Sequence, residues 1–202
     1  MLLVLALGGC TSGSGLFAGG TAITASQGTT TTAPAAPDSV PAPATVATTP
    51  TAGATTGPCN YRQDSGYVLP DPGCTPGVTN PSVSQANIDQ TICVRGWTST
   101  VRPEESYTET LKRQQMDRYG QTGSMSGYEE DHLVPLELGG SPADPRNLWP
   151  EPGASPTPKD DVEYAANRAV CSGGMPLAQA QQEIATDWVT FGESLGVLKG
   201  GG

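Results

Sequence analysis

The sequence predicts an α+β fold, in which a small and mostly helical domain contains one embedded pair of short strands and is cross-linked by disulfides. Three observations support this class. Four segments have the caps or apolar spacing of helices, one segment holds two strand-like stretches around a glycine-rich turn, and four cysteines are spread over the same region. The chain has no run of about 18 apolar residues, so no transmembrane helix is expected.

The first two expected helices are marked by signals at their ends. A short helix over residues 85–93 can be capped by Ser84, and Gly96 would end it. The second helix begins at residues 106–109, Ser-Tyr-Thr-Glu, which form a capping-box pattern, and Gly120 is its stop signal.

The last two expected helices are indicated by a cap pattern and by apolar spacing. Thr157 precedes Pro158, and Asp160 lies three residues after Thr157, so a helix begins here and Gly173 ends it. The last helix has apolar residues at steps of three and four, which indicates a face that packs in the core. The residues of this face are Leu177, Ala180, Ile184, Trp188 and Phe191.

Charge is distributed very unevenly along the chain. Residues 1–57 hold one charged side chain, Asp38, whereas residues 58–202 hold 10 basic and 19 acidic side chains, a net charge of −9. Proteins that bind nucleic acid through bulk charge use clusters of Lys and Arg. The acidic balance excludes that mode, so any chemistry on nucleic acid has to come from a local site.

The amino terminus is a short apolar run that ends in small residues and Cys10. Residues 7–10, Leu-Gly-Gly-Cys, resemble the lipobox of bacterial lipoproteins, in which the cysteine thiol carries diacylglycerol. The run lacks the basic segment of a secretory signal, so we expect the signal to start further upstream. A buried strand with Cys10 in the core is the alternative. Residues 1–10 are therefore interpreted as a lipoprotein signal segment, which predicts an extracytoplasmic protein that is anchored to the cell membrane or secreted.

Residues 11–57 form a low-complexity segment. Thr, Ala, Gly, Pro and Ser make up 40 of its 47 residues, a composition that buries too little apolar surface to offset the entropy of ordering. We expect a disordered tether that moves the following domain away from a membrane or wall.

Four cysteines follow the tether: Cys59, Cys74, Cys93 and Cys171. An even number in an exported chain indicates two disulfides, and four cysteines allow three pairings. We favour Cys59 with Cys74, which closes a turn-rich loop, and Cys93 with Cys171, which joins the start of the core to a late helix. The alternative is a zinc site, but the chain lacks the closely spaced Cys-x-x-Cys pairs that such a site requires.

The most informative stretch lies between the second and third helices. Residues 128–140 read Tyr-Glu-Glu-Asp-His-Leu-Val-Pro-Leu-Glu-Leu-Gly-Gly, and residues 144–150 read Asp-Pro-Arg-Asn-Leu-Trp-Pro. The first of these contains His132, the only histidine of the chain. A strand through His132, a glycine-rich turn, a second strand at residues 147–149 and the helix after Thr157 would form a ββα unit.

This pattern of Asp-His, Pro, Gly-Gly and Asn-Leu resembles the HNH, or ββα-metal, nucleases. It is most similar to secreted bacterial proteins of that class, which have a similar Asp-His-Leu-x-Pro-Leu-x-Leu-Gly-Gly and Asn-Leu-Trp-Pro-Glu. The metal-finger part of the resemblance covers residues 128–170, and a wider resemblance covers most of residues 71–188. It implies an HNH-like finger within the α+β domain. The alternative is a chance Asp-His pair on the surface.

The resemblance implies roles for three residues. His132 would be the general base that takes a proton from water, because an imidazole is unprotonated and still basic near neutral pH. Asp131 would be a ligand of a divalent metal, for which Mg²⁺ suits a hard carboxylate oxygen best. Asn147 would orient His132 through a hydrogen bond.

The remaining site residues are less typical of the family. A further metal ligand is normally His or Asn in the first turns of the helix, whereas this chain offers Asp160 and Glu163, which share one helical face. These carboxylates could hold the ion, could mark a degenerate site, or could simply complement the helix dipole. Arg146 is the candidate for clamping substrate phosphate, with a solvated loop arginine as the alternative. Trp149 is interpreted as a core residue rather than a platform for a base.

The favoured function is therefore metal-dependent hydrolysis of nucleic acid by an extracytoplasmic HNH-like endonuclease. Its domain would span residues 58–195, and residues 196–202 would form a flexible glycine-rich tail. The alternative is a non-catalytic envelope lipoprotein or interaction module that keeps the fold, since fold alone does not imply function. Nucleic acid as substrate, the membrane through the lipid anchor, and envelope components are the partners that these functions imply.

Overall fold

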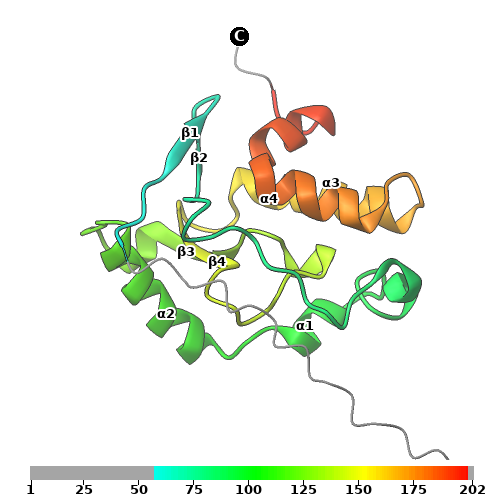
Figure 1. Cartoon of the computed structure of the whole chain (residues 1–202), viewed down its shortest axis with the longest axis horizontal. Helices are drawn as coiled ribbons and strands as arrows, with labels where there is room; N and C mark the ends of the chain where they lie inside the picture. Colours follow the sequence, from blue (N-terminus) through cyan, green and yellow to red (C-terminus); the bar gives the residue numbers. More distant parts are fainter. Residues whose placement is uncertain (1–56, 200–202) are drawn as a thin grey trace, which may run out of the picture. The chain divides into compact units, whose positions relative to one another are not determined.

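Two antiparallel strand pairs and four α-helices form the part of the chain that the structure, a computed structural model, describes: residues 57–199 (Figure 1). The elements are β1 (Arg62–Asp64), β2 (Tyr67–Leu69), α1 (Trp97–Val101), α2 (Glu105–Arg118), β3 (Tyr128–His132), β4 (Leu148–Pro152), α3 (Pro158–Cys171) and α4 (Leu177–Ser194). Short 3-10 helices occupy Gln85–Gln90, Met125–Gly127 and Leu136–Leu138. The predicted lipidation site Cys10, and the predicted tether up to residue 56, lie outside the described residues.

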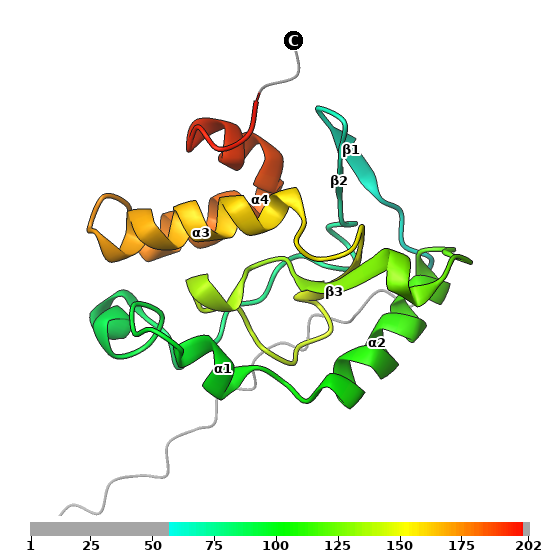
Figure 2. The same cartoon turned by 180° about the vertical axis from the view of Figure 1, so that it is seen from behind.

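The paired strands β3 and β4 lie between two groups of helices. Helices α3 and α4 lie side by side on one side of the pair, and α1 and α2 lie on the other, as the two opposite views agree (Figures 1 and 2). The main core joins α3, α4 and the strands, and it includes Trp149, Val162, Ile184 and Trp188. Trp149 is completely buried, so its interpretation as a core residue is confirmed.

The predicted second helix is present as α2, but it begins earlier than its capping pattern indicated. Glu104 is the N-cap, and its carbonyl oxygen accepts hydrogen bonds from the backbone N–H groups of Tyr107 and Thr108 at 3.0 and 3.3 Å. Ser106 therefore lies inside the helix. The end of the helix is as predicted, because Gly120 takes the left-handed conformation with φ of 64°, which glycine adopts without a steric penalty.

The predicted helix over residues 85–93 is wrong in type and length. Only residues 85–90 are helical, as a 3-10 helix, and Gly96 is the N-cap of α1 rather than a helix end. The side chain of Asn87 accepts a hydrogen bond from the Ser84 N–H at 2.8 Å and donates one to the Ser82 carbonyl at 2.9 Å. Together with Ser84 as the N-cap, the first of these bonds completes a capping box, so the predicted cap is present although the helix that follows it is short and of the 3-10 type.

The predicted start of α3 is confirmed in detail. Thr157 is the N-cap, Pro158 occupies the first helical position, and the Thr157 N–H donates a hydrogen bond to the Asp160 carboxylate at 2.5 Å. This capping box fixes the first turn of α3 directly after β4.

All five residues of the predicted apolar face of the last helix are buried in α4. The helix is interrupted at Asp187, whose φ and ψ of −161° and 96° are not helical. The Asp187 carboxylate accepts hydrogen bonds from the N–H groups of Val189 and Thr190, both at 3.0 Å, so it acts as a cap for the final turns. Beyond α4, Leu198 packs against the main core.

The two disulfides join the favoured cysteine pairs. Cys59 is bonded to Cys74, and Cys93 to Cys171, across 15 and 78 residues of sequence. Both bonds are typical of an oxidising, extracytoplasmic compartment. Within residues 57–199, no helix is both long and apolar enough to cross a membrane.

We expect the longer disulfide loop to contribute more to stability than the shorter one. Replacing Cys93 and Cys171 by serine should lower the free energy of unfolding by about 4.5 kcal/mol, and replacing Cys59 and Cys74 by about 3 kcal/mol, because the loops of 78 and 15 residues restrict the unfolded chain to different extents. Urea denaturation of the two double variants measures this order. Free thiols in the oxidised wild-type protein, or the reverse order, would contradict the prediction.

Candidate functional site

Strands β3 and β4 bring the predicted site residues together. The strands are antiparallel, with Asp131 opposite Trp149 and His132 opposite Leu148. Asn147 directly precedes β4, and the first turns of α3 follow a few residues after its end. Two strands and a helix therefore converge on Asp131 and His132 in the order that the sequence predicted.

His132 is held in one defined orientation. Its side chain is 5% exposed, and its Nε2 lies 2.9 Å from the carbonyl oxygen of Pro142. A carbonyl oxygen only accepts, so Nε2 carries the proton and donates it, and Nδ1 of the neutral ring is left as the basic nitrogen. Burial lowers the pKa of His132 below its ordinary value, with the Pro142 contact opposing this shift. The imidazole is therefore neutral at physiological pH.

Two cavities adjoin His132. The larger, of about 500 Å³, is also lined by Arg102, Lys112 and Tyr128. The smaller, of about 80 Å³, is lined mainly by carboxylates, together with His132 and Arg102. The carboxylates of this smaller cavity belong to Glu129, Glu130, Asp131, Glu137, Asp160 and Glu163. The larger cavity has room for part of a nucleotide, whereas the smaller has room only for a few water molecules.

Asn147 does not contact His132, and the predicted hydrogen bond between them is wrong. Its side chain is fully buried, and its amide oxygen accepts from the N–H groups of Val78 and Val134 at 3.1 and 3.0 Å. Its amide nitrogen donates to the carbonyl oxygens of Val134 and Ser141 at 2.9 and 3.0 Å. Asn147 thus holds the turn between β3 and β4. It positions His132 only indirectly, because the carbonyl that accepts from His132 follows Ser141 in this turn.

Steric constraints in the same turn explain why the motif has two consecutive glycines. A Cβ atom on Gly140 would lie 1.7 Å from the carbonyl oxygen of Val134 and 2.8 Å from the amide nitrogen of Asn147. Gly139 has a φ of 69°, which side chains rarely allow. The turn therefore approaches Asn147 too closely for any residue larger than glycine.

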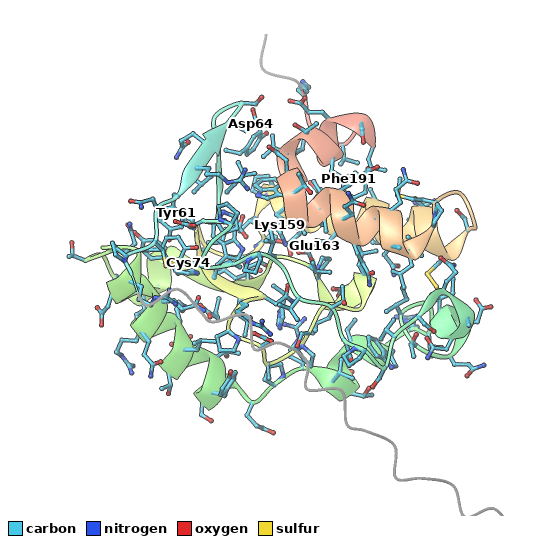
Figure 3. All side chains as sticks on the ribbon, in the orientation of Figure 1. Tyr61, Asp64, Cys74, Lys159, Glu163 and Phe191 are labelled. Carbon is cyan, nitrogen blue, oxygen red and sulfur yellow. A yellow bond between two sulfur atoms is a disulfide. The ribbon has the colours of Figure 1, made fainter. Side chains whose placement is uncertain are left out.

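Asp131 is part of an ion pair. Its Oδ2 accepts from the indole Nε1 of Trp149 at 3.0 Å and lies 2.8 Å from the Nζ of Lys159. Lys159 also contacts Glu163, whose Oε1 lies 2.5 Å from the same Nζ (Figure 3). Lys159 is not among the predicted site residues, because nothing in the sequence indicates that a lysine in the first turn of a helix is buried.

The residues present do not fit the predicted metal centre. Asp131 and Glu163 are bridged by the Lys159 ammonium group, and Asp160 accepts the capping hydrogen bond from Thr157. Among residues 57–199, no group of three His, Cys, Asp or Glu side chains is arranged to hold a metal ion. Asp131, Asp160 and Glu163 line the smaller cavity together, but each has a protein partner, so their role as metal ligands stays a prediction.

Arginine positions also differ from the prediction. Arg146 is paired with Asp144, with Nε to Oδ1 at 3.0 Å and Nη2 to Oδ2 at 2.6 Å, and it lines neither cavity beside His132. Arg102 lines both cavities, and its guanidinium forms no hydrogen bond or ion pair with another described residue. In the sequence Arg102 directly precedes a proline, and this context does not indicate that its side chain lies beside His132.

Two further glutamates lie near the ion pair, Glu151 buried and Glu130 half-buried. Glu151 is 4% exposed, and burial, reinforced by Asp131, raises its pKa to about 9. Burial and Asp131 also raise the pKa of Glu130 to about 8. Both oxygens of Glu130 and the Oε2 of Glu151 have no hydrogen-bond partner among the described residues. Both side chains therefore favour the protonated form at neutral pH.

The raised pKa of Glu151 predicts that stability falls as pH rises. Between the pKa of an ordinary glutamate and about 9, the folded state keeps a proton that the unfolded state has released, so unfolding becomes easier by up to about 1.4 kcal/mol per pH unit. Glu151→Gln, which mimics the protonated side chain, should flatten this dependence between pH 5 and pH 8. Melting temperatures of both proteins across this range measure the effect, and parallel curves would contradict it.

No family model, curated protein or solved structure matches this chain.

Proposed function

We propose that this domain hydrolyses phosphodiester bonds in nucleic acid, with His132 as the general base. The observation that supports this most is the fixed tautomer of His132: Nε2 is committed to the Pro142 carbonyl, and Nδ1 is available to accept a proton. A water molecule would transfer its proton to Nδ1 while its oxygen attacks phosphorus. The bond from phosphorus to the leaving sugar oxygen would break, and that oxygen would keep the electron pair and take up a proton from solvent water. The resemblance of residues 128–170 to HNH nucleases supports the same reaction.

Arg102 is the proposed phosphate contact, in place of Arg146. Its guanidinium adjoins the larger cavity next to His132 and is free of carboxylate partners in the described part of the chain. A planar guanidinium binds phosphate oxygens through two parallel hydrogen bonds and offsets their charge. Lys112, which lines the same cavity, is already paired with Glu109 at 3.3 Å.

The test is direct incubation of the purified chain with plasmid DNA and with RNA. Reactions in Mg²⁺, in Mn²⁺ and in EDTA separate metal-dependent from metal-independent cleavage, and Arg102→Ala compared with Arg146→Ala identifies the phosphate contact. We expect cleavage by the wild type, a much lower rate for Arg102→Ala, and a small effect of Arg146→Ala. Absence of cleavage of both substrates in all three conditions would contradict the proposed activity.

A non-catalytic envelope module is the second candidate function. The observation in its favour is the acidic lining around His132: Glu105, Glu109, Glu129 and Glu130 border the larger cavity. Those of these side chains that are ionised oppose the approach of phosphate. A folded wild-type protein that cleaves nothing would decide for this candidate.

We also propose that Cys10 carries a lipid that anchors the chain, which agrees with the oxidised cysteine pairs of the domain. In a bacterial cell that expresses the chain with a complete export signal, Cys10→Ala should move the protein from the membrane fraction to the soluble extracytoplasmic fraction. A diacyl thioether supplies more than one buried acyl chain, which stable attachment requires. Fractionation with immunodetection measures this, and equal membrane retention of the variant would contradict the anchor.

A further inference from the structure

Lys159 is completely buried, and its charged group is fully coordinated by protein oxygens. Its Nζ lies 2.8 Å from Oδ2 of Asp131, 2.5 Å from Oε1 of Glu163 and 2.9 Å from the backbone carbonyl oxygen of His132. An ammonium group has three N–H donors, so these three contacts satisfy it. Figure 3 shows Lys159 and Glu163 adjacent to each other in the interior, near the strands.

The surroundings of Lys159 are those of a cation site. Burial by itself lowers the pKa of Lys159, but Asp131, Glu163 and Glu151 outweigh this effect, so the net pKa is raised and the group is charged. A buried charge without partners costs several kcal/mol, so the ammonium and the carboxylates depend on one another. Every ion pair of Asp131 and Glu163 in the described residues involves Lys159.

The ammonium nitrogen occupies a position at which Oδ2 of Asp131 and Oε1 of Glu163 could otherwise share a metal ion. A metal held jointly by Asp131 and Glu163 would lie within about 2.0–2.6 Å of one oxygen of each, which is the range for Mg²⁺ and Ca²⁺. Nζ already lies between the Oδ2 and Oε1 atoms at hydrogen-bond distance. The Lys159 ammonium group and a metal ion cannot both occupy that position, and their like charges would repel each other in the buried surroundings.

We propose that the ammonium group of Lys159 is the resident cation of this site and takes the place of a divalent metal between Asp131 and Glu163. The side chain is tethered to α3 and links the helix to the end of β3, next to His132. Occupation of the site then requires no metal uptake and is unaffected by chelators. This inference concerns cation binding, so it holds or fails independently of whether the domain cleaves nucleic acid.

The first test is made on the wild-type protein. The chain has three lysines, of which Lys112 and Lys199 serve as internal references for the Nζ signals of ¹⁵N-labelled protein in NMR. Millimolar Mg²⁺ should leave the Lys159 signal unchanged, and Mn²⁺ titration by calorimetry should show no binding that depends on Asp131. Displacement of the Lys159 signal, or saturable Mn²⁺ binding that Asp131→Asn abolishes, would overturn the proposal.

The second test removes the resident cation. Lys159→Met keeps the length of the side chain but leaves the carboxylates without their partner, so the folded variant should bind one Mn²⁺ ion at least tenfold more tightly than the wild type. The control is Lys112→Met, which removes a partly exposed ion pair with Glu109 and should not change Mn²⁺ binding. A folded Lys159→Met variant with no gain in affinity would overturn the proposal.

A third variant separates cation binding from loss of folding. Lys159→Met combined with Glu163→Gln removes one positive and one negative charge together, so it should be more stable than Lys159→Met alone and should gain less affinity for Mn²⁺. Thermal unfolding with and without Mn²⁺ measures both quantities. If Lys159→Met does not fold even with Mn²⁺, the wild-type titration and NMR measurement decide the matter.

Discussion

Replacing His132 by alanine is expected to lower the rate of phosphodiester cleavage by roughly 10²–10⁴-fold, the usual contribution of a general base. The imidazole is the group whose Nδ1 is left free to accept a proton, because Nε2 donates to Pro142. Single-turnover cleavage of a labelled oligonucleotide measures the loss.

His132→Gln and the pH profile distinguish catalysis from a structural role. A glutamine amide can donate to the Pro142 carbonyl but cannot act as a base near neutral pH, so this variant should remain as stable as the wild type and still be inactive. Burial lowers the pKa of His132, so wild-type activity should decline only as pH falls through a value below the ordinary 6.5. Activity of the glutamine variant close to wild type would contradict the assignment.

Replacing Asn147 by alanine is expected to lower the free energy of unfolding by roughly 3–5 kcal/mol, the largest effect on stability that we predict for a single side chain. The side chain makes four hydrogen bonds to backbone groups of Val78, Val134 and Ser141, and it is fully buried. Removing it leaves buried backbone groups without partners, which costs more than the bonds themselves contribute. Urea denaturation monitored by tryptophan fluorescence measures the change.

The matched control for this variant is Asn87→Ala. Asn87 makes two hydrogen bonds to backbone groups at the exposed surface, where water can replace them, so its loss should cost less than about 1 kcal/mol. Asn147→Ala should also reduce cleavage, because the turn that carries the Pro142 carbonyl loses its support. Equal stabilities of the two variants would contradict the role assigned to Asn147.

Local signals in the sequence predicted a helix correctly where the interactions that stabilise it also act over only a few residues. Capping by Thr157 and Asp160 acts over three residues, and the apolar spacing of α4 acts over single turns, so both could be recognised without a structure. The cap of the helix predicted over residues 85–93 is also present, since Ser84 and Asn87 form a capping box, but the local signals did not show that this helix is of the 3-10 type and ends at Gln90.

Local signals were not sufficient to predict the contacts of the site residues. Asp131, His132 and Asn147 could be selected from the motif, but their partners could not. Asn147 supports a turn rather than His132 because its bonds go to backbone groups that only the folded turn brings near. Arg102 comes from the end of α1, far from the motif in sequence, and its position depends on how that helix packs against the 3-10 helix at Leu136–Leu138.

The sequence by itself determined the α+β class and the ββα order of the strands and α3, because short-range spacing and caps govern these features. It allowed three cysteine pairings and favoured one, and the tertiary structure decided between them by bringing Cys93 next to Cys171. Only the tertiary structure decided which cation meets Asp131 and Glu163. A lysine in a first helical turn is usually solvated, and it becomes an internal counter-ion only when the strand end and the helix approach closely enough to exclude water. That approach depends on packing across the whole core, which no local pattern encodes.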